Sequence, residues 1–455
     1  MKIALLTHKI KPPLIGGVDV YTDRLGRALR RLGHEVVYLA FDSSGEGSQP
    51  VVQADAHHDG ARVWRILFAF DALPKETFDT AYNPAMGHAT RQILAEEQPD
   101  FVIILNFYML TLATVEAAKS LGIPVAHVAT DFVPVCRWGT FMRWDNRTCE
   151  VGESIQTCAS CFISHRPLGK VMSAVLEKLP EPTVVNWAEK EYRLPHPLGV
   201  ARPYLTHAAT MKQRLDRLRP LRQQIDLVLV PTRFTETTFR NNGFAAEQVH
   251  FLPFGVDTDN PLASISKTKS DHVRFMFLGR FQPYKGLHLV LEAFNSLPNP
   301  GGASLTIYGA PDGHDAYFAN LQHMMDANPL IHFAGLIPPT ELARAFADAD
   351  IFLLPSTWHE NSPLILLDAL QSKTPVLASD IGGVSGIVEH NRNGLLFPRE
   401  DVAALRQEMQ RLIDQPTLIR QLQAGSDLPS IESYAETIVT KMQAFLPNPK
   451  PAGVA

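Results

Sequence analysis

The sequence of 455 residues contains only four cysteines and no long hydrophobic run. Four cysteines are too few for a disulfide scaffold, and a transmembrane helix needs about 20 apolar residues. The best apolar window, residues 101–115, is shorter than that and contains Asn106. The apolar run before His8 is also too short for the core of a signal peptide. We therefore expect a cytoplasmic location, with peripheral contact at the inner face of a membrane left open.

An excess of positive charge is missing as well. The chain has 42 Lys and Arg against 47 Asp and Glu, a formal net charge of −5. Because proteins bind nucleic acid mainly by neutralising its phosphates, we expect no nucleic-acid partner. With 45% hydrophobic and 20% charged residues, the composition is that of a globular protein, and the length favours two domains.

The chain consists of two α/β halves in tandem, each with apolar strands that alternate with helical patterns. The alternation is lost after Asp131 in an irregular, Cys-rich insertion over about residues 132–165. We predict an amino-terminal domain over 1–262, a second domain over 263–430, and a C-terminal helix and tail over 431–455.

Glycine and basic residues occur at the expected strand-to-helix connections of both halves. Gly16-Gly17 follows the first expected strand, and Gly279-Arg280 and Lys285 follow the strand that opens the second half. Ligands of parallel sheets bind beyond the carboxyl ends of the strands, where bare backbone N–H groups and cations could hold a diphosphate. A plain turn and a solvated pair of cations are the competing interpretations.

The segment HENSPLILLDAL predicts a helix that begins at an anion-binding end. Ser362 has the chemistry of an N-cap and Pro363 that of a first helical residue, so the N–H groups of Leu364 and Ile365 would point outward. Glu360 precedes this end and Asp368 lies about two turns inside the helix. Their carboxylates could accept hydrogen bonds from sugar hydroxyls. A loop charge and a capping or ion-pair residue are the alternatives.

These motifs together resemble a known family. Residues 277–294 and 349–398, with the glycine pair Gly382-Gly383, resemble the donor-binding half of the family 4 glycosyltransferases. Residues 16–36 and the segment VHFLPFGVDTD (249–259) resemble the first half of the same family. The resemblance is most specific over the second half and looser over about 140–225.

The resemblance implies a GT-B fold, in which two Rossmann-like domains face each other across a cleft and the C-terminal helix returns to the first domain. It implies a retaining transferase, with a hexosyltransferase as the favoured class. The donor would be a nucleotide-diphosphate sugar and the acceptor a saccharide or lipid-linked saccharide, in cell-envelope or exopolysaccharide biosynthesis. No catalytic metal is expected.

The resemblance also assigns roles to residues. Arg280 and Lys285 would hold the diphosphate, Glu360 the donor sugar and Asp368 the ribose. The family's second carboxylate is usually Glu, and its His-Asp pair is here Thr130-Asp131, so the His is missing and Asp131 is expected to position a substrate. The predicted catalytic set is Arg280, Lys285, Glu360 and Asp131, and the donor-binding set is Gly16, Gly17, Gly279, Ser362, Leu364, Ile365 and Asp368.

All four cysteines lie between Cys136 and Cys161, in the spacing C-x12-C-x8-C-x2-C. A C-x2-C pair presents two thiolates to one ion, and four thiolates complete a tetrahedral zinc site. Some members of the same family carry a similar insertion. We therefore predict one structural zinc bound by Cys136, Cys149, Cys158 and Cys161, with free buried thiols or disulfides as alternatives.

Other interpretations of the chain remain open. The basic segment 211–224 could meet a lipid-linked acceptor or a membrane surface, although such a run is more often a solvated helix face. A nicotinamide-dependent enzyme would need a G-x-G-x-x-G turn, which is absent. A UDP-sugar epimerase and a nucleotide-sugar-binding protein without transfer activity are closer alternatives. The sequence does not identify the base, the sugar, the acceptor, the linkage or the oligomeric state.

Overall fold

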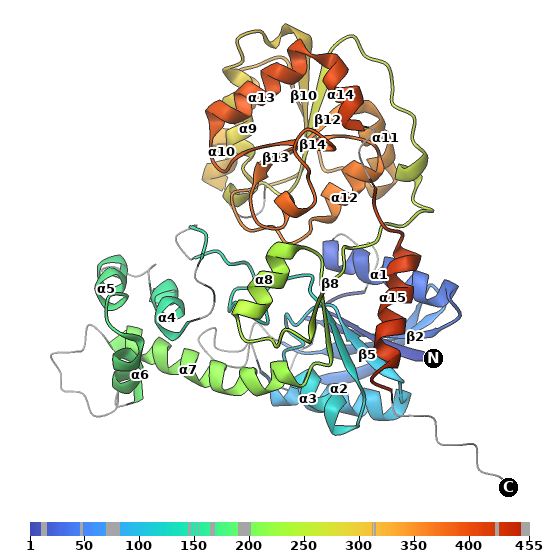
Figure 1. Ribbon diagram of the computed structural model, residues 1–455, viewed down its shortest axis with the longest axis vertical. Helices are drawn as coiled ribbons and strands as arrows, with labels where there is room; N and C mark the ends of the chain where they lie inside the picture. The colour runs from blue at the N-terminus through green and yellow to red at the C-terminus, as the bar shows by residue number, and fades with distance from the viewer. Residues whose placement is uncertain are drawn as a thin grey trace. The chain divides into compact units, whose positions relative to one another are not determined.

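The chain divides into two compact units (Figure 1). The first comprises Met1–Pro231, Glu236–Leu252 and Glu432–Ala455, and the second Thr232–Thr235 and Pro253–Ile431. The second unit thus begins before the predicted boundary at 262/263. This computed structural model describes residues 1–10, 16–45, 49–69, 82–143, 147–150, 152, 154–163, 169–189, 202–311, 313, 315–423 and 427–446.

The described part of the first unit contains an eight-stranded sheet with the order β3-β4-β2-β1-β5-β6-β7-β8. Its neighbouring strands run parallel except in the β3–β4 pair. Residues of β5, β6 and β7 are buried throughout, as in a parallel sheet covered on both faces. The strands are β1 (Lys2–Thr7), β2 (Glu35–Asp42), β3 (Val51–His58), β4 (Ala61–Leu67), β5 (Phe101–Ile104), β6 (Val125–Val128), β7 (Leu227–Val230) and β8 (Val249–Phe251).

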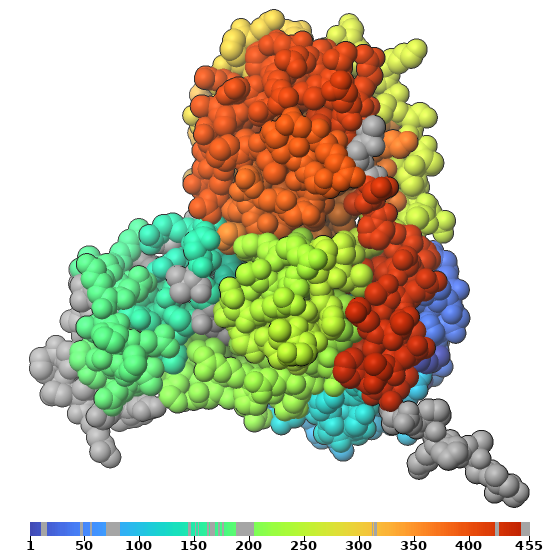
Figure 2. All heavy atoms as spheres, in the orientation of Figure 1, coloured from blue at the N-terminus to red at the C-terminus, as the bar shows by residue number. Residues whose placement is uncertain are grey.

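Helices connect these strands, and the C-terminal helix returns to the first unit, as expected. Glu432 of α15 forms an ion pair with Arg31, and the ring of Tyr434 packs edge-on against Tyr21 at 5.9 Å. In the space-filling view the outer face of α15, in red, is exposed to solvent (Figure 2). The helices are α1 (Gly17–Arg31), α2 (Pro84–Glu97), α3 (Ala113–Ser120), α8 (Arg233–Asn241) and α15 (Ile431–Gln443).

The long connection between β6 and β7 is more ordered than the sequence predicted. Only its first part is irregular, and from Ile155 onward it forms α4 (Ile155–Ile163), α5 (Gly169–Leu176), α6 (Glu181–Glu189) and α7 (Arg202–Gln223). The expectation of an irregular insertion reaching about residue 165 is therefore wrong. Helices of eight or nine residues span barely two turns, which is too short for a clear helical period. Helices α4, α6 and α7 share a separate buried cluster that includes Ile155, Ala159, Val184, Tyr204, Leu205 and Met211.

Several basic side chains of α7 have partners within the chain. Arg214 is buried and donates to the carbonyl oxygen of Val133, and Arg222 is buried and donates to that of Asn242. Arg217 pairs with Glu116 on α3. The alternative of a solvated helix face therefore fails for Arg214 and Arg222, whereas Arg217 and Arg219 are exposed. Among the described residues, no helix is both long and apolar enough to cross a membrane.

The second unit is a six-stranded parallel sheet with the order β11-β10-β9-β12-β13-β14. Successive side chains of a strand point to opposite faces, so Phe275 and Phe277 of β9 join one buried cluster and Met276 joins another. The first cluster includes α9 and α13, and the second α11 and α12. The strands are β9 (Val273–Leu278), β10 (Ala303–Tyr308), β11 (Ile331–Gly335), β12 (Ile351–Leu354), β13 (Val376–Asp380) and β14 (Gly394–Pro398).

The helices of the second unit thus cover both faces of its sheet, giving three layers. They are α9 (Leu287–Asn295), α10 (Asp315–Asp326), α11 (Leu342–Asp348), α12 (Leu364–Gln371), α13 (Val402–Asp414) and α14 (Pro416–Gln423).

Candidate functional site

Lys285 and Glu360 meet at the carboxyl edge of the second sheet. Lys285 follows β9 and Glu360 follows β12, and these strands are neighbours. Lys285 Nζ lies 2.6 Å from Glu360 Oε1, and the Ser356 hydroxyl donates to the same oxygen at 2.7 Å. The Glu360 side chain is only 7% exposed. A buried carboxylate thus has a lysine and a hydroxyl as its partners, at the edge where parallel sheets bind ligands.

Two aromatic rings fix the position of the Lys285 ammonium. Nζ lies 4.9 Å from the ring centroid of Trp358, within the range of a cation–π contact. The ring of Tyr284 packs against Trp358 at 4.8 Å between centroids. The sequence analysis did not identify either aromatic residue, although Tyr284 directly precedes Lys285. Together the two rings restrict the flexible Lys285 side chain and keep its ammonium beside Glu360.

Glycines allow the loops around this pair to pack closely. Gly286 has φ +72°, and a Cβ there would lie 2.0 Å from the carbonyl oxygen of Pro355. A Cβ on Gly383 would lie 1.6 Å from the carbonyl oxygen of Asn361. The N–H of Gly383 donates to the carbonyl oxygen of Glu360 at 2.8 Å. The backbone of Gly382-Gly383 thus packs closely on the loop that carries Glu360.

Helix α12 begins one residue later than predicted. Pro363, with ψ 124°, occupies the N-cap position, and no side chain caps the helix. The prediction that Ser362 is the N-cap is therefore wrong, because the extended residue before the helix is the proline itself. Leu364 and Ile365 still form the first turn, where N–H groups have no acceptor within the helix. Ser362 lies just before that turn and is buried, as is Asp368 in the second turn.

Gly279 and Arg280 lie on the connection from β9 to α9 that also carries Lys285. A Cβ on Gly309, at the end of β10, would lie 2.0 Å from the carbonyl oxygen of Gly279, so the two strand ends are in close contact. Arg280 is exposed, and its carbonyl oxygen accepts from the N–H of Gln282 at 2.8 Å. Both cations predicted to bind the diphosphate are therefore on one strand-to-helix connection.

Asp131 lies beyond the end of β6 in the first unit. Asn106 Nδ2 donates to Asp131 Oδ2 at 2.6 Å, and the N–H of Val133 donates to Oδ1 at 2.8 Å. Burial raises the pKa of Asp131 to about 7, despite these donors. The sequence analysis did not assign a role to Asn106. Because β5 and β6 are neighbours, Asn106 and Asp131 meet at the carboxyl edge of the first sheet.

His127 belongs to the core. Its ring is completely buried, and Nδ1 lies 2.9 Å from the carbonyl oxygen of Ile104. The ring stacks on Phe239 at 6.0 Å between centroids. Burial lowers the pKa of His127 to about 4, so the ring is neutral near pH 7. The residue does not take the place of the missing family histidine.

A second acid-base pair, His8 and Asp19, was missed by the sequence analysis. His8 follows β1, and its Nδ1 lies 3.3 Å from Oδ1 of Asp19 in the first turn of α1. Burial raises the pKa of Asp19 and lowers that of His8. The Gly16 N–H donates to the Asp19 carboxylate, so an anion at Gly16-Gly17 would compete with it. An acid at the third helical position is the signal that could have predicted this contact.

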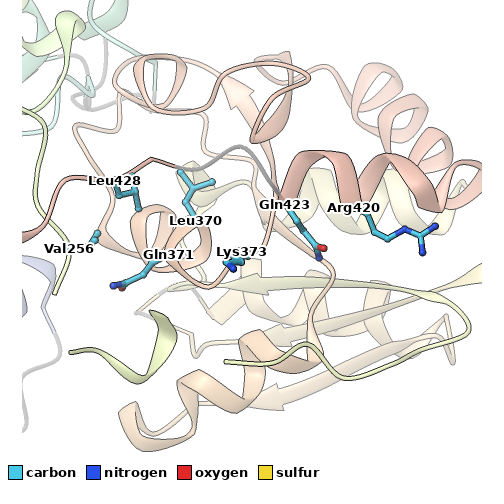
Figure 3. Close-up of a pocket in the computed structure, with 7 residues that line it drawn as sticks. All are labelled: Val256, Leu370, Gln371, Lys373, Arg420, Gln423 and Leu428. Atoms are coloured by element: carbon cyan, nitrogen blue, oxygen red, sulfur yellow. The ribbon is translucent and has the colours of Figure 1, made fainter. Parts of the chain in front are cut away.

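The four cysteines all have free thiols and line one cavity of about 30 Å³ in the first unit. A larger cavity of about 460 Å³ lies in the second unit (Figure 3). Its lining includes Gln371 at the C-terminal end of α12, whereas Glu360 precedes the N-terminal end of that helix. The larger cavity is therefore separate from the Lys285–Glu360 site. Its lining residues are Val256, Leu370, Gln371, Lys373, Arg420, Gln423 and Leu428.

Both halves of the chain match family models of glycosyltransferases. Residues 16–157 match the Glycosyl transferase 4-like domain, and residues 262–426 match Glycosyl transferases group 1. Among curated relatives, the Amylovoran biosynthesis glycosyltransferase AmsK of Erwinia amylovora is 28% identical over 42% of this chain and 48% of its own length. A GDP-mannose-dependent alpha-(1-6)-phosphatidylinositol monomannoside mannosyltransferase of Mycobacterium tuberculosis is 26% identical over 50% of this chain and 63% of its own length. The chain thus spans about half the length of the curated relatives that it matches.

Solved structures resemble the whole chain. Sucrose-phosphate synthase from Thermosynechococcus elongatus matches with a TM-score of 0.61 and 18% identity, over 98% of this chain and 96% of its own. Anabaena Alr3699/HepE in complex with UDP matches with a TM-score of 0.63 and 15% identity, over 98% of this chain and 100% of its own. These likenesses concern the fold, and they confirm the expected GT-B class.

Proposed function

We propose that this chain, which carries a Glycosyl transferase 4-like domain and a Glycosyl transferases group 1 domain, is a retaining hexosyltransferase that uses a nucleotide-diphosphate sugar. The observation that carries the proposal is the Lys285–Glu360 pair just before the first turn of α12. A cation, a carboxylate and unused helical N–H groups on adjacent loops offer separate partners for the phosphate and the sugar of one donor.

In the proposed reaction, Lys285 and Arg280 stabilise the negative charge that develops on the departing nucleoside diphosphate. Charge stabilisation of this kind acts mostly in the transition state and therefore raises kcat. Glu360 has two carboxylate oxygens, so it can accept hydrogen bonds from sugar hydroxyls while Oε1 keeps Lys285 in place. Asp368 would contact the ribose. Because two cations meet the diphosphate charge, transfer is expected to proceed without added magnesium.

In the proposed route the acceptor attacks the face of the anomeric carbon from which the diphosphate departs, so the anomeric configuration is retained. The bond from the anomeric carbon to the diphosphate breaks, the acceptor oxygen bonds to the same face, and the departing phosphate takes the acceptor's proton. Glu360 orients the donor and forms no covalent bond in this route. NMR of the product should show the anomeric configuration of the donor, and an inverted product would overturn the mechanism.

The acceptor is proposed to be a saccharide or lipid-linked saccharide of the cell envelope or of an exopolysaccharide. The names of two relatives, one of amylovoran biosynthesis and one acting on a phosphatidylinositol monomannoside, support this class. Peripheral membrane contact stays a prediction, because Arg214 and Arg222 of the basic segment are buried and only its other basic residues could meet a lipid surface.

A screen with UDP-, GDP- and ADP-sugars tests the proposal. One class should raise the melting temperature, and the same donor should support transfer to an acceptor, measured by mass spectrometry of the product. Donor binding without transfer to any acceptor would instead favour a nucleotide-sugar-binding protein. This is the main competing candidate, because Thr130 stands where the family has a histidine. An epimerised nucleotide sugar would indicate the epimerase.

A further inference from the structure

The four thiols come from separate segments of the first unit and line one cavity. Cys136 lies in the loop after β6, Cys149 directly follows Thr148, which forms an antiparallel bridge with Met142, and Cys158 and Cys161 lie on α4. The cavity of about 30 Å³ exceeds the roughly 10–15 Å³ that one water needs. One small ion therefore fits between the four cysteines.

The cavity is suited to a metal that prefers sulfur. Its lining contains no histidine or carboxylate among the described residues, and the other lining residues with polar side chains are Arg137, Trp138 and Thr157. Four sulfurs and no oxygen ligands select zinc over calcium or magnesium. Arg137 also places a positive charge beside a site whose four thiolates would give it a net charge of −2.

We infer that Cys136, Cys149, Cys158 and Cys161 bind one structural zinc ion in this cavity. Four cysteine ligands leave no open coordination position, so this zinc takes no part in the transfer reaction. Among the described residues, no three His, Cys, Asp or Glu side chains stand in coordination geometry. Binding therefore requires the thiols to turn inward, and rotation about a single bond between staggered positions redirects each sulfur.

The backbone around Cys136 is arranged to receive a thiolate. N–H groups of Trp138, Thr140 and Phe141 donate to its sulfur, and the turn that aims them depends on Gly139 at φ +69°. The N–H of Cys149 donates to the carbonyl oxygen of Phe141 at 2.7 Å, which ties the second cysteine to the same turn. Hydrogen bonds from groups that do not themselves bind the metal commonly orient the ligands that do.

Zinc would join the loop after β6 to α4. That loop carries Asp131, and its Phe132 ring packs on Phe141 at 5.0 Å between centroids. Metal binding can supply the free energy that orders such an irregular segment. Loss of zinc should therefore loosen the loop of Asp131 while leaving the second unit intact.

The test uses the full chain, purified without added zinc and analysed by inductively coupled plasma mass spectrometry. We expect about one zinc per chain, and Cys158→Ser should lose most of it. Thr157→Ser is the matched control, because residue 157 lines the same cavity but supplies no thiol. The control should keep its zinc.

Substitution of cobalt in the wild-type chain gives a test that does not depend on a variant that may fail to fold. Four thiolates should produce strong near-ultraviolet charge-transfer bands and visible bands of tetrahedral Co²⁺. Four thiols that react at once with a thiol reagent in a metal-free native protein would overturn the inference. Disulfides found by mass spectrometry, or iron with the visible absorbance of an iron–sulfur cluster, would overturn it as well.

Discussion

Replacement of Lys285 by methionine tests the role of the ion pair at the second sheet. Methionine keeps the unbranched side chain against Trp358 but removes the ammonium that lies 2.6 Å from Glu360 Oε1. If Lys285 stabilises charge on the leaving diphosphate, its loss should lower kcat by about 10²–10³, which corresponds to about 2.7–4 kcal/mol of transition-state stabilisation. Initial rates of sugar transfer at saturating donor measure this change.

The same variant also leaves the Glu360 carboxylate without its charged partner. Loss of a hydrogen bond to a charged group costs about 1.5–3 kcal/mol of folding free energy, but Ser356 still donates and Lys285 is partly exposed, so we expect the lower end. Urea unfolding separates this loss from the kinetic one. Lys373→Met, at the far end of α12, is the control and should keep kcat.

Two results would refute the reasoning about Lys285. The first is a kcat within about twofold of the wild type with an unchanged donor KM. The second is a fall in kcat that Glu360→Gln fully restores in the double variant, because the lysine would then serve only to neutralise the carboxylate. A double-mutant cycle between Lys285 and Glu360 distinguishes these cases.

Two further variants address the other sheet edge and the glycine loop. Burial raises the pKa of Asp131 from 3.8 to about 7, so the folded chain holds a proton that the unfolded chain releases between those values, and this group makes stability fall as pH rises. The free energy of unfolding of Asp131→Asn, measured in urea, should therefore rise relative to that of the wild type as the pH increases from 4 to 8. A difference between the two proteins that does not change with pH would contradict the assignment. Gly383→Ala should lower transfer at least tenfold, because its Cβ would lie 1.6 Å from the carbonyl oxygen of Asn361, whereas Gly301→Ala, with no atom closer than 3.9 Å, should leave the rate unchanged.

Local patterns predicted the strand that opens the second unit and the helix that begins near Pro363, whereas α10, α13 and α14 were not predicted. The apolar run at the start of that unit became β9, and the glycine and lysine after it fall in the connection to α9. The helices α4, α5 and α6 were missed, since each is short, and α4 and α6 pack in a buried cluster with α7 of the same insertion. For such segments, tertiary packing rather than sequence period decides the structure.

The contact between Lys285 and Glu360 could not be derived from the sequence. Both residues were identified as candidates, but they are separated by 75 positions, and their distance depends on the neighbouring placement of β9 and β12. A sequence pattern predicts where along the chain each strand ends, whereas the order of the strands in the sheet determines which of these ends are neighbours. The pairing of functional residues is thus a property of topology.

The carboxyl edge of the first sheet differs from that of the second, because burial there shifts the pKa of its ionisable groups. His8, Asn106 and Asp131 follow β1, β5 and β6, three strands that lie side by side. The raised pKa of Asp131 and Asp19 and the lowered pKa of His8 all shift these groups toward their neutral forms. Groups shifted toward their neutral forms suit neutral sugar hydroxyls better than phosphate. The charged pair in the second unit suits phosphate, so the chemistry of the two units supports separate acceptor and donor roles in the proposed reaction.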